Sequence, residues 1–208
     1  MSKIKDIISS AKGSVIVAAT KYVDSAKMIE LLSNGINHFG ENRVDSFLQK
    51  YEELKDYSEI TWHFIGSLQT NKVKKMINKI SYLHSLNSIK LAEVIDKYRN
   101  TPLNCFLEIN LTDSLTKTGL SISDVDGVLE NIKKLKNVNV IGLMCMTEPT
   151  MTDMEKEETF NKLVSLRDRL NSQGYKGITH LSMGMSDDFL IAVKCGADFL
   201  RLGRILFS

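Results

Sequence analysis

The chain has 208 residues, 43% of them hydrophobic and 25% charged, with a formal net charge of +2 at pH 7. This is the composition of an ordinary globular domain, and the nearly balanced charge argues against a polyanionic partner such as nucleic acid. Residues 1–12 alternate in charge and lack an uninterrupted apolar segment, which excludes a signal peptide or a membrane span there. We therefore expect one cytoplasmic domain covering residues 1–208.

The first strand is expected at residues 14–21, where apolar residues follow one another without alternation, as in parallel strands covered on both faces. It ends on Lys21. A short amphipathic helix is expected before it, at residues 3–12, and a longer helix after it, at residues 24–34. This strand and the helix after it make the first of a series of similar units.

The same unit recurs along the rest of the chain, because apolar strand segments alternate with segments whose apolar residues recur at helical spacing. Ser121 to Asp124 and Thr152 to Glu155 each have the form of a capping box that begins a helix. Further strands are expected at residues 36–39, 60–66, 80–86, 105–111, 138–146, 178–183 and 198–203, and further helices at 43–56, 72–78, 88–98, after 121, after 152 and at 187–194.

Eight strands that alternate with helices are the signature of a closed (β/α)8 TIM barrel. An open doubly wound sheet is the alternative. However, no GxGxxG motif follows the first strand, and all eight units are similar in kind. We therefore predict an α/β fold with a single compact barrel.

In a parallel barrel the carboxyl ends of all strands meet at one mouth, where ligands bind. Lys21 and Arg201 would lie there together. Desolvation and a neighbouring cation both lower the pKa of a lysine ammonium, and the resulting neutral amine is a nucleophile that attacks aldehydes. The segment from Ser182 to Ser186, together with Gly203, offers hydroxyl and backbone N–H groups to a phosphate. The polar residues expected at the mouth are Lys21, Asn42, His63, Ser85, Asn110, Thr147, Ser182 and Arg201.

A lysine amine that attacks aldehydes, a phosphate site and an arginine suit pyridoxal 5′-phosphate (PLP). A sugar-phosphate aldolase would also use a Schiff-base lysine in a barrel, but it needs further acid and base carboxylates at the mouth. Only Glu41 and Glu108 are well placed for that role. The residues therefore favour PLP over the aldolase class without settling the choice.

Several segments of the chain resemble those of the pyridoxal phosphate homeostasis proteins. The similarity spans nearly the whole chain, and its most specific blocks are Trp62–Gly66 and Ser182–Asp188. The segments that carry it are Ala18–Lys21, Phe39–Asn42, Trp62–Gly66, Leu68–Lys72, Lys117–Gly119, Gly142–Met144, Leu181–Asp188 and Arg201–Gly203.

This resemblance implies a single-domain barrel like the N-terminal domain of bacterial alanine racemase, with PLP held as a Schiff base on Lys21. It also implies that Ser182 and the N–H groups of Gly203 and Arg204 hold the phosphate, and that Arg201 faces the pyridine nitrogen. An arginine there stays protonated and weakens the cofactor ring as an electron sink. The implied role is PLP homeostasis or supply and the balance of amino and keto acids, with no established catalytic reaction.

Two features depart from the family pattern. Arg204 stands where a small residue is expected, which adds a charge near the phosphate but leaves the backbone donor in place. The chain also ends at Ser208, earlier than relatives usually do, so we expect an abbreviated closing segment. Asn42 has two open interpretations, as a turn residue or as a ligand of the cofactor.

The remaining motifs favour ordinary structural roles. The histidines have no HxxH or HExxH spacing, so we expect hydrogen-bonded barrel residues and no metal site. The lysines of residues 72–79 are expected to form a solvated helix face. The cysteines are far apart and lack a CxxC motif, which favours buried reduced thiols at Cys105, Cys145 and Cys195.

The alternative function is a PLP-dependent amino-acid racemase that uses Lys21 as one base. Racemisation needs a second base on the opposite face of the cofactor, which in alanine racemase is a tyrosine from a partner's extra domain, and Tyr22 is poorly placed to replace it. We therefore expect no catalytic residues and a monomer that binds a small-molecule cofactor. PLP-dependent apoenzymes are the expected partners, with no nucleic acid and no membrane.

Overall fold

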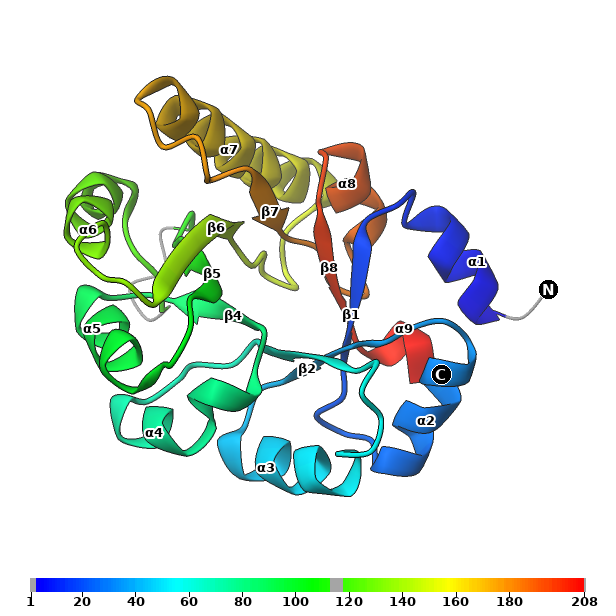
Figure 1. Cartoon of the computed structure of the whole chain (residues 1–208). Helices are drawn as coiled ribbons and strands as arrows, with labels where there is room; N and C mark the ends of the chain where they lie inside the picture. Colours follow the sequence, from blue (N-terminus) through cyan, green and yellow to red (C-terminus); the bar gives the residue numbers. More distant parts are fainter. Residues whose placement is uncertain (1–2, 113–117, 208) are drawn as a thin grey trace.

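Eight parallel strands close into a barrel in the order of the sequence in the computed structural model, which describes residues 3–112 and 118–207 (Figure 1). This confirms the predicted (β/α)8 barrel and excludes the open sheet. The strands are β1 Val15–Ala19, β2 His38–Glu41, β3 Thr61–Phe64, β4 Tyr82–Leu86, β5 Leu103–Glu108, β6 Val138–Met144, β7 His180–Ser182 and β8 Phe199–Leu202.

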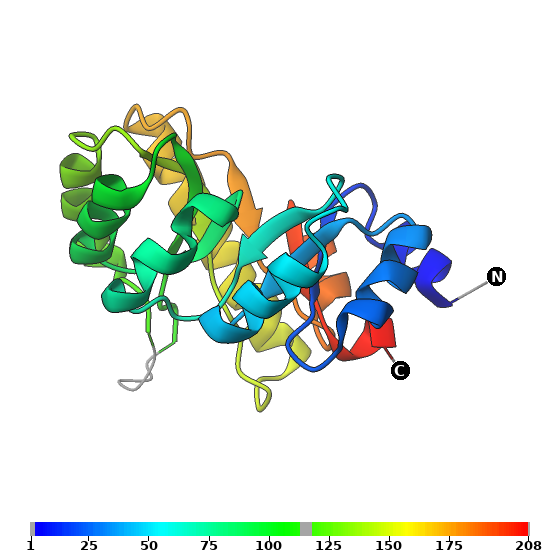
Figure 2. The same ribbon diagram turned by 60° about the horizontal axis from the view of Figure 1, so that its bottom comes forward.

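The helices form a ring outside the barrel, and the two ends of the described chain lie on the same side of it (Figures 1 and 2). Among the described residues, no helix is long and apolar enough to cross a membrane. The α-helices are α1 Lys3–Ser10, α2 Ser25–Ser33, α3 Val44–Glu53, α4 Val73–Met76, α5 Ile89–Tyr98, α6 Val125–Ile132, α7 Asp153–Ser172, α8 Phe189–Lys194 and α9 Arg204–Phe207. Short 3₁₀ turns occur at η1 Thr70–Lys72, η2 Ile77–Lys79 and η3 Ile122–Asp124.

Strand β1 is covered on both faces, as its unbroken apolar run predicts. Val17 points into the barrel, where it packs with the interior residues Phe106, Met144 and Phe199. Its neighbours Ile16 and Ala18 belong to the larger core between the barrel and the helices. The strand is therefore fixed from both sides, and its carboxyl end rigidly supports the turn after it.

The two expected capping boxes have different outcomes. Thr152 caps α7 with a complete box, in which Thr152 and Glu155 bond each other's backbone N–H groups. The prediction of a capping box at Ser121 is wrong, because the 3₁₀ turn η3 precedes α6 and the Asp124 N–H donates to the Ser121 carbonyl oxygen. The Ser121 hydroxyl bonds the Asp124 carboxylate instead, at 2.6 Å.

The segment expected as a basic helix at 72–78 is less regular than predicted, since α4 is one turn long and lies between η1 and η2. Its lysines are nevertheless on a solvated face: Lys74, Lys75 and Lys79 are exposed. Cys105 and Cys145 are buried free thiols, as predicted, whereas the free thiol of Cys195 is only partly buried.

Candidate functional site

The residues predicted to bind a cofactor come from four strands of the barrel and all lie at or just after the carboxyl end of a strand. Because the strands are parallel and the barrel is closed, these positions share one mouth. Lys21 and Asn42 follow β1 and β2, Ser182 ends β7, and Arg201, Gly203 and Arg204 lie in or just after β8.

Lys21 lies in the turn after β1 with an exposed side chain. Its ammonium lies 4.7 Å from the centroid of the Tyr22 ring, and Tyr22 itself is 85% exposed. The expectation that Lys21 is desolvated is therefore wrong: the amine is in contact with solvent and with one aromatic face. An accessible amine remains suited to condensation with an aldehyde.

A buried ion pair fixes the backbone just before Lys21. Lys50 Nζ lies 2.6 Å from Glu41 Oε1 and donates to the carbonyl oxygen of Thr20 at 2.6 Å. The Thr20 hydroxyl donates to the same Glu41 oxygen at 2.5 Å. Lys50 on α3 thus joins the residue before Lys21 to the residue before Asn42.

Sequence reasoning missed Lys50, although a signal was present. Lys50 follows Phe47 by three positions and precedes Leu54 by four, which places it on the buried face of α3. The pair also changes the role expected of Glu41, since a fully buried carboxylate bonded to Lys50 is not a free acid or base at the mouth. This weakens the aldolase alternative.

The mouth contains two buried acceptors without a partner among the described residues, Asn42 Oδ1 and Glu108 Oε2. Gly66 packs directly against Asn42, because a Cβ at Gly66 would lie 2.2 Å from the Asn42 carbonyl oxygen. The other oxygen of Glu108 accepts from Thr118 at 2.6 Å. Buried polar atoms normally have partners, so these two oxygens are candidates for hydrogen bonds from a ligand. Lys117, the first residue of the motif that it forms with Thr118 and Gly119, lies outside the described residues.

Two backbone N–H groups converge on one oxygen after β8. The Ser186 hydroxyl accepts from Gly203 N at 3.2 Å and from Ile205 N at 3.4 Å. Convergent N–H groups beside a hydroxyl are the donor set that holds a phosphate oxygen. The contacts of the hydroxyl are with Gly203 and Ile205, while the Arg204 side chain turns to the Asp187 carboxylate.

The loop that carries Ser186 is held in shape by Asp188 and Gly184. The buried Asp188 carboxylate accepts from Met185 N and from the Thr147 hydroxyl, each at 2.5 Å. Gly184 has φ +92°, and a Cβ there would lie 2.5 Å from the Ala192 Cβ. Only glycine fits this position, so the close packing of the loop on α8 explains the glycine of the motif.

Arg201 and Ser182 bind each other in the barrel interior. The Arg201 guanidinium donates to Ser182 Oγ at 2.6 Å and to the Cys145 carbonyl oxygen at 2.8 Å. Burial lowers the pKa of Arg201 from its ordinary value, yet an arginine stays charged at neutral pH. Arg201 therefore presents only N–H donors to a ligand, which suits an unprotonated ring nitrogen.

Each histidine is hydrogen-bonded, as predicted, and His38, His63 and His84 are bonded to one another. In the described part of the chain no cluster of side chains could hold a metal ion. His63 was expected at the mouth, but it lies in the barrel interior between His38 and His84 and is fully buried. His180 bonds the Thr179 hydroxyl at 2.8 Å.

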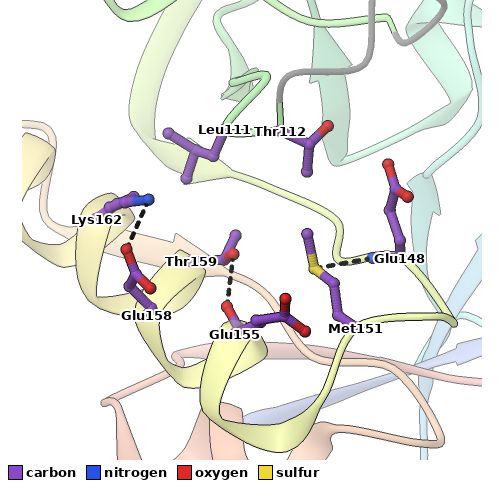
Figure 3. Close-up of a pocket in the computed structure, with 8 residues that line it drawn as sticks. All are labelled: Leu111, Thr112, Glu148, Met151, Glu155, Glu158, Thr159 and Lys162. Atoms are coloured by element: carbon purple, nitrogen blue, oxygen red, sulfur yellow. Dashed lines mark hydrogen bonds and ion pairs between the residues drawn. The ribbon is translucent and has the colours of Figure 1, made fainter.

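A hollow of about 460 Å³ lies beside the mouth, between the segment after β5, the loop after β6 and the first half of α7 (Figure 3). Among the described residues, three carboxylates line it, those of Glu148, Glu155 and Glu158, together with one lysine, Lys162, which is paired with Glu158 at 2.9 Å. Because like charges repel, this hollow does not suit a phosphate.

The alanine racemase N-terminal domain family matches residues 1–208 of the chain. The chain is also 38% identical over 196 residues to a pyridoxal phosphate homeostasis protein of Aquifex aeolicus, a match that covers 93% of this chain and 86% of that protein.

The same fold occurs in PipY of Synechococcus elongatus. The PipY structure without PLP is 31% identical, with a TM-score of 0.93 over 99% of this chain and 98% of PipY. The PipY structure with PLP bound is 30% identical, with a TM-score of 0.91 over 100% of both chains. These matches confirm the resemblance indicated by the sequence motifs. The chain therefore belongs to the pyridoxal phosphate homeostasis proteins, within the alanine racemase N-terminal domain family.

Proposed function

We propose that this protein binds PLP at the carboxyl end of its barrel, as a Schiff base on Lys21, and acts in PLP homeostasis and supply and in the balance of amino and keto acids. The observation that carries the proposal is the similarity, over the full length of both chains, to PipY with PLP bound. The convergent N–H groups at Ser186 and the buried unpaired acceptors of the mouth support it.

Each site residue has a role in this proposal. Lys21 supplies the amine, which condenses with the cofactor aldehyde with loss of water. Ser182 and the N–H groups of Gly203 and Arg204 are assigned to the phosphate, to which the structure adds Ser186 as a candidate. Asn42 is assigned to the cofactor as a polar contact, and Arg201 to the pyridine nitrogen. PLP, when bound, supplies an electrophilic carbon for amines.

The proposal includes no catalytic reaction. A racemase would need a second base across the cofactor from Lys21, and the nearest tyrosine, Tyr22, has its ring against the Lys21 ammonium. We also propose one PLP-binding domain over residues 1–208, a monomer, apoenzymes as recipients of the cofactor, and a cytoplasmic location. The free thiols of all three cysteines suit a reducing compartment.

The Schiff base is tested with visible absorption spectra of the protein with and without PLP, followed by borohydride reduction and peptide mass mapping. We expect a visible band and a reduced adduct on Lys21. Lys21→Ala should abolish both, while weaker non-covalent binding persists at the phosphate end. Lys27→Ala, which removes a partly exposed lysine of α2 paired with Glu30, is the matched control. A band that survives Lys21→Ala, or adducts on scattered lysines, would refute the assignment.

The racemase alternative is tested separately, by incubating the PLP-loaded protein with several amino acids in deuterated water. We expect no inversion and no exchange of the α-hydrogen above the rate with free PLP. Exchange that depends on Lys21 would show that the protein is an enzyme.

A further inference from the structure

Three histidines, a serine and an arginine form one continuous hydrogen-bonded chain through the interior of the barrel. His38 Nδ1 lies 2.9 Å from His63 Nε2, and His63 Nδ1 lies 2.9 Å from His84 Nε2. His84 Nδ1 lies 2.7 Å from Ser182 Oγ, the atom that accepts from Arg201. The chain thus joins side chains of β2, β3, β4, β7 and β8.

The three rings lie at successive levels of the barrel, from the amino end of the strands toward their carboxyl end. His38 pairs in register with Thr61, and His63 is two residues beyond Thr61 on β3. His63 in turn pairs with Tyr82, and His84 is two residues beyond Tyr82 on β4. Each step therefore advances toward the mouth on the same face of the sheet. The partly exposed His38 also lines a hollow of about 250 Å³ at the amino end.

The two inner rings are held firmly in position. His63 stacks on Tyr82 with the ring centroids 4.5 Å apart and the planes 6° from parallel. His84 stacks on Phe106 with the centroids also 4.5 Å apart. Both histidines are fully buried. Stacking and burial therefore fix the planes of these two rings.

The chain has two consistent arrangements of protons when all three rings are neutral. Burial lowers the pKa of His38, and lowers those of His63 and His84 well below the ordinary value, so neutral rings are expected at neutral pH. In the first arrangement Ser182 donates to His84 Nδ1, and every ring carries its proton on Nε2. In the second, every ring carries its proton on Nδ1, and His84 donates to Ser182.

Each contact between two rings joins two nitrogen atoms, of which one must carry a proton and the other must accept it. A mixed set of tautomers would therefore place two donors or two acceptors against each other. Such a contact costs the desolvation of an unpaired buried polar group. The tautomers of the three rings are therefore coupled, although His38 and His84 make no direct hydrogen bond with each other.

We propose that His38, His63 and His84 form a proton relay that connects solvent at the amino end of the barrel with Ser182, and that their shared tautomer sets the direction in which Ser182 donates. In this role the histidines are positioning residues for the Ser182–Arg201 pair, and their relevance to PLP rests on the proposed function.

The proton transfer is balanced, and all three rings are neutral both before and after it. Conversion of the first arrangement to the second releases one proton from His38 Nε2 to water. Each ring receives a proton on Nδ1 from its neighbour, and His84 receives the Ser182 proton. Water at the mouth returns one proton to Ser182 Oγ. The Ser182 hydroxyl then donates toward the mouth, where the cofactor phosphate is proposed to lie.

The relay is tested first in the unmodified protein without PLP, by NMR with ¹⁵N-labelled histidine. We expect couplings across the N–H···N bonds between His38 and His63 and between His63 and His84, and the same tautomer in all three rings. Mixed tautomers, or the absence of both couplings, would overturn the relay whether or not PLP binds.

A second test uses His38→Phe, which removes the hydrogen-bond partner of His63 Nε2, and with it the balance between the two arrangements, and preserves a ring of similar size. The relay predicts a change of tautomer at His84, two hydrogen bonds away, and a shifted absorption spectrum of bound PLP. His180→Phe, which replaces the histidine outside the chain, should change neither. An unchanged His84 tautomer in a folded His38→Phe protein would refute the coupling. If that protein still binds PLP on Lys21, only the relay has failed; if unmodified protein does not bind PLP, the proposed function has failed.

Discussion

The Ser186 and Ser182 hydroxyls have different partners although they lie four residues apart. Ser186 Oγ accepts from Gly203 N and Ile205 N, after β8. Ser182 Oγ is fully buried and contacts His84 and the Arg201 guanidinium. At the scale of single residues, the proposed phosphate end of the site therefore has two serines with distinct chemistry, one among backbone donors and one in the barrel interior.

We predict that Ser186→Ala weakens PLP binding about fivefold, because one hydrogen bond to the phosphate, worth about 1 kcal/mol, is lost. Fluorescence titration with PLP measures the change. Ser172→Ala, which removes an exposed hydroxyl bonded to the Arg169 carbonyl oxygen at the end of α7, is the control. Unchanged affinity in Ser186→Ala would return the phosphate contact to Ser182, as the family resemblance implies.

Helices α6 and α7 begin with similar sequence signatures but different structures. Thr152 and Glu155 form a reciprocal box at the first turn of α7. At α6 the 3₁₀ turn η3 uses the Asp124 N–H for a bond to the Ser121 carbonyl oxygen, so the Ser121 side chain has no N–H to accept from there. At the scale of elements, the capping signature therefore stabilises a helix only where the first turn is α-helical.

Thr152→Ala should lower the free energy of unfolding by about 1 kcal/mol, the usual contribution of an N-cap. Ser121→Ala is the matched comparison and should change it by less than about 0.5 kcal/mol, as exposed substitutions away from special features do. Urea unfolding at constant pH measures both. Equal losses in the two variants would mean that Ser121 caps α6 in solution.

The barrel interior is polar along one diagonal, because His38, His63 and His84 cross it. Burial lowers the pKa of His63 and of His84 well below the ordinary value of 6.5, and lowers that of His38. In the unfolded chain His63 and His84 take up protons as the pH falls through 6.5, whereas in the folded protein both rings stay neutral. At the scale of the whole molecule, acid therefore lowers the free energy of unfolding.

The direction of this pH dependence follows from the protons that the unfolded chain binds and the folded protein does not. The stability contributed by neutral rings is complete above the unfolded pKa and decreases as the pH falls below it, by about 1.4 kcal/mol per pH unit for each of the buried rings of His63 and His84. We predict a lower free energy of unfolding at about pH 5.5 than at about pH 7.5, a window above the titration of ordinary carboxylates. Urea unfolding at the two values, with direct measurement of protons taken up, checks this. Equal stability without proton uptake would contradict it.

The amino-acid sequence alone was enough to predict the alternation of strands and helices. From that alternation followed the barrel, and the carboxyl end of its strands as the place of Lys21, Asn42 and Arg201. These features are local, because apolar spacing and capping residues act over one or two turns and parallel strands have only one carboxyl end. The Thr152 box and the two buried faces of β1 have the same short-range cause.

The polar groups that meet inside the barrel were not predictable in this way, because they are brought together by the closed fold. Ser182 and His84 are 98 residues apart, and Lys50 reaches the Thr20 carbonyl oxygen across 30 residues. Strand register and tilt bring such side chains together, and neither is encoded in the spacing of residues along the chain. For the same reason Lys21, expected to be desolvated by its apolar strand, is exposed: the turn after β1 carries its side chain away from the core.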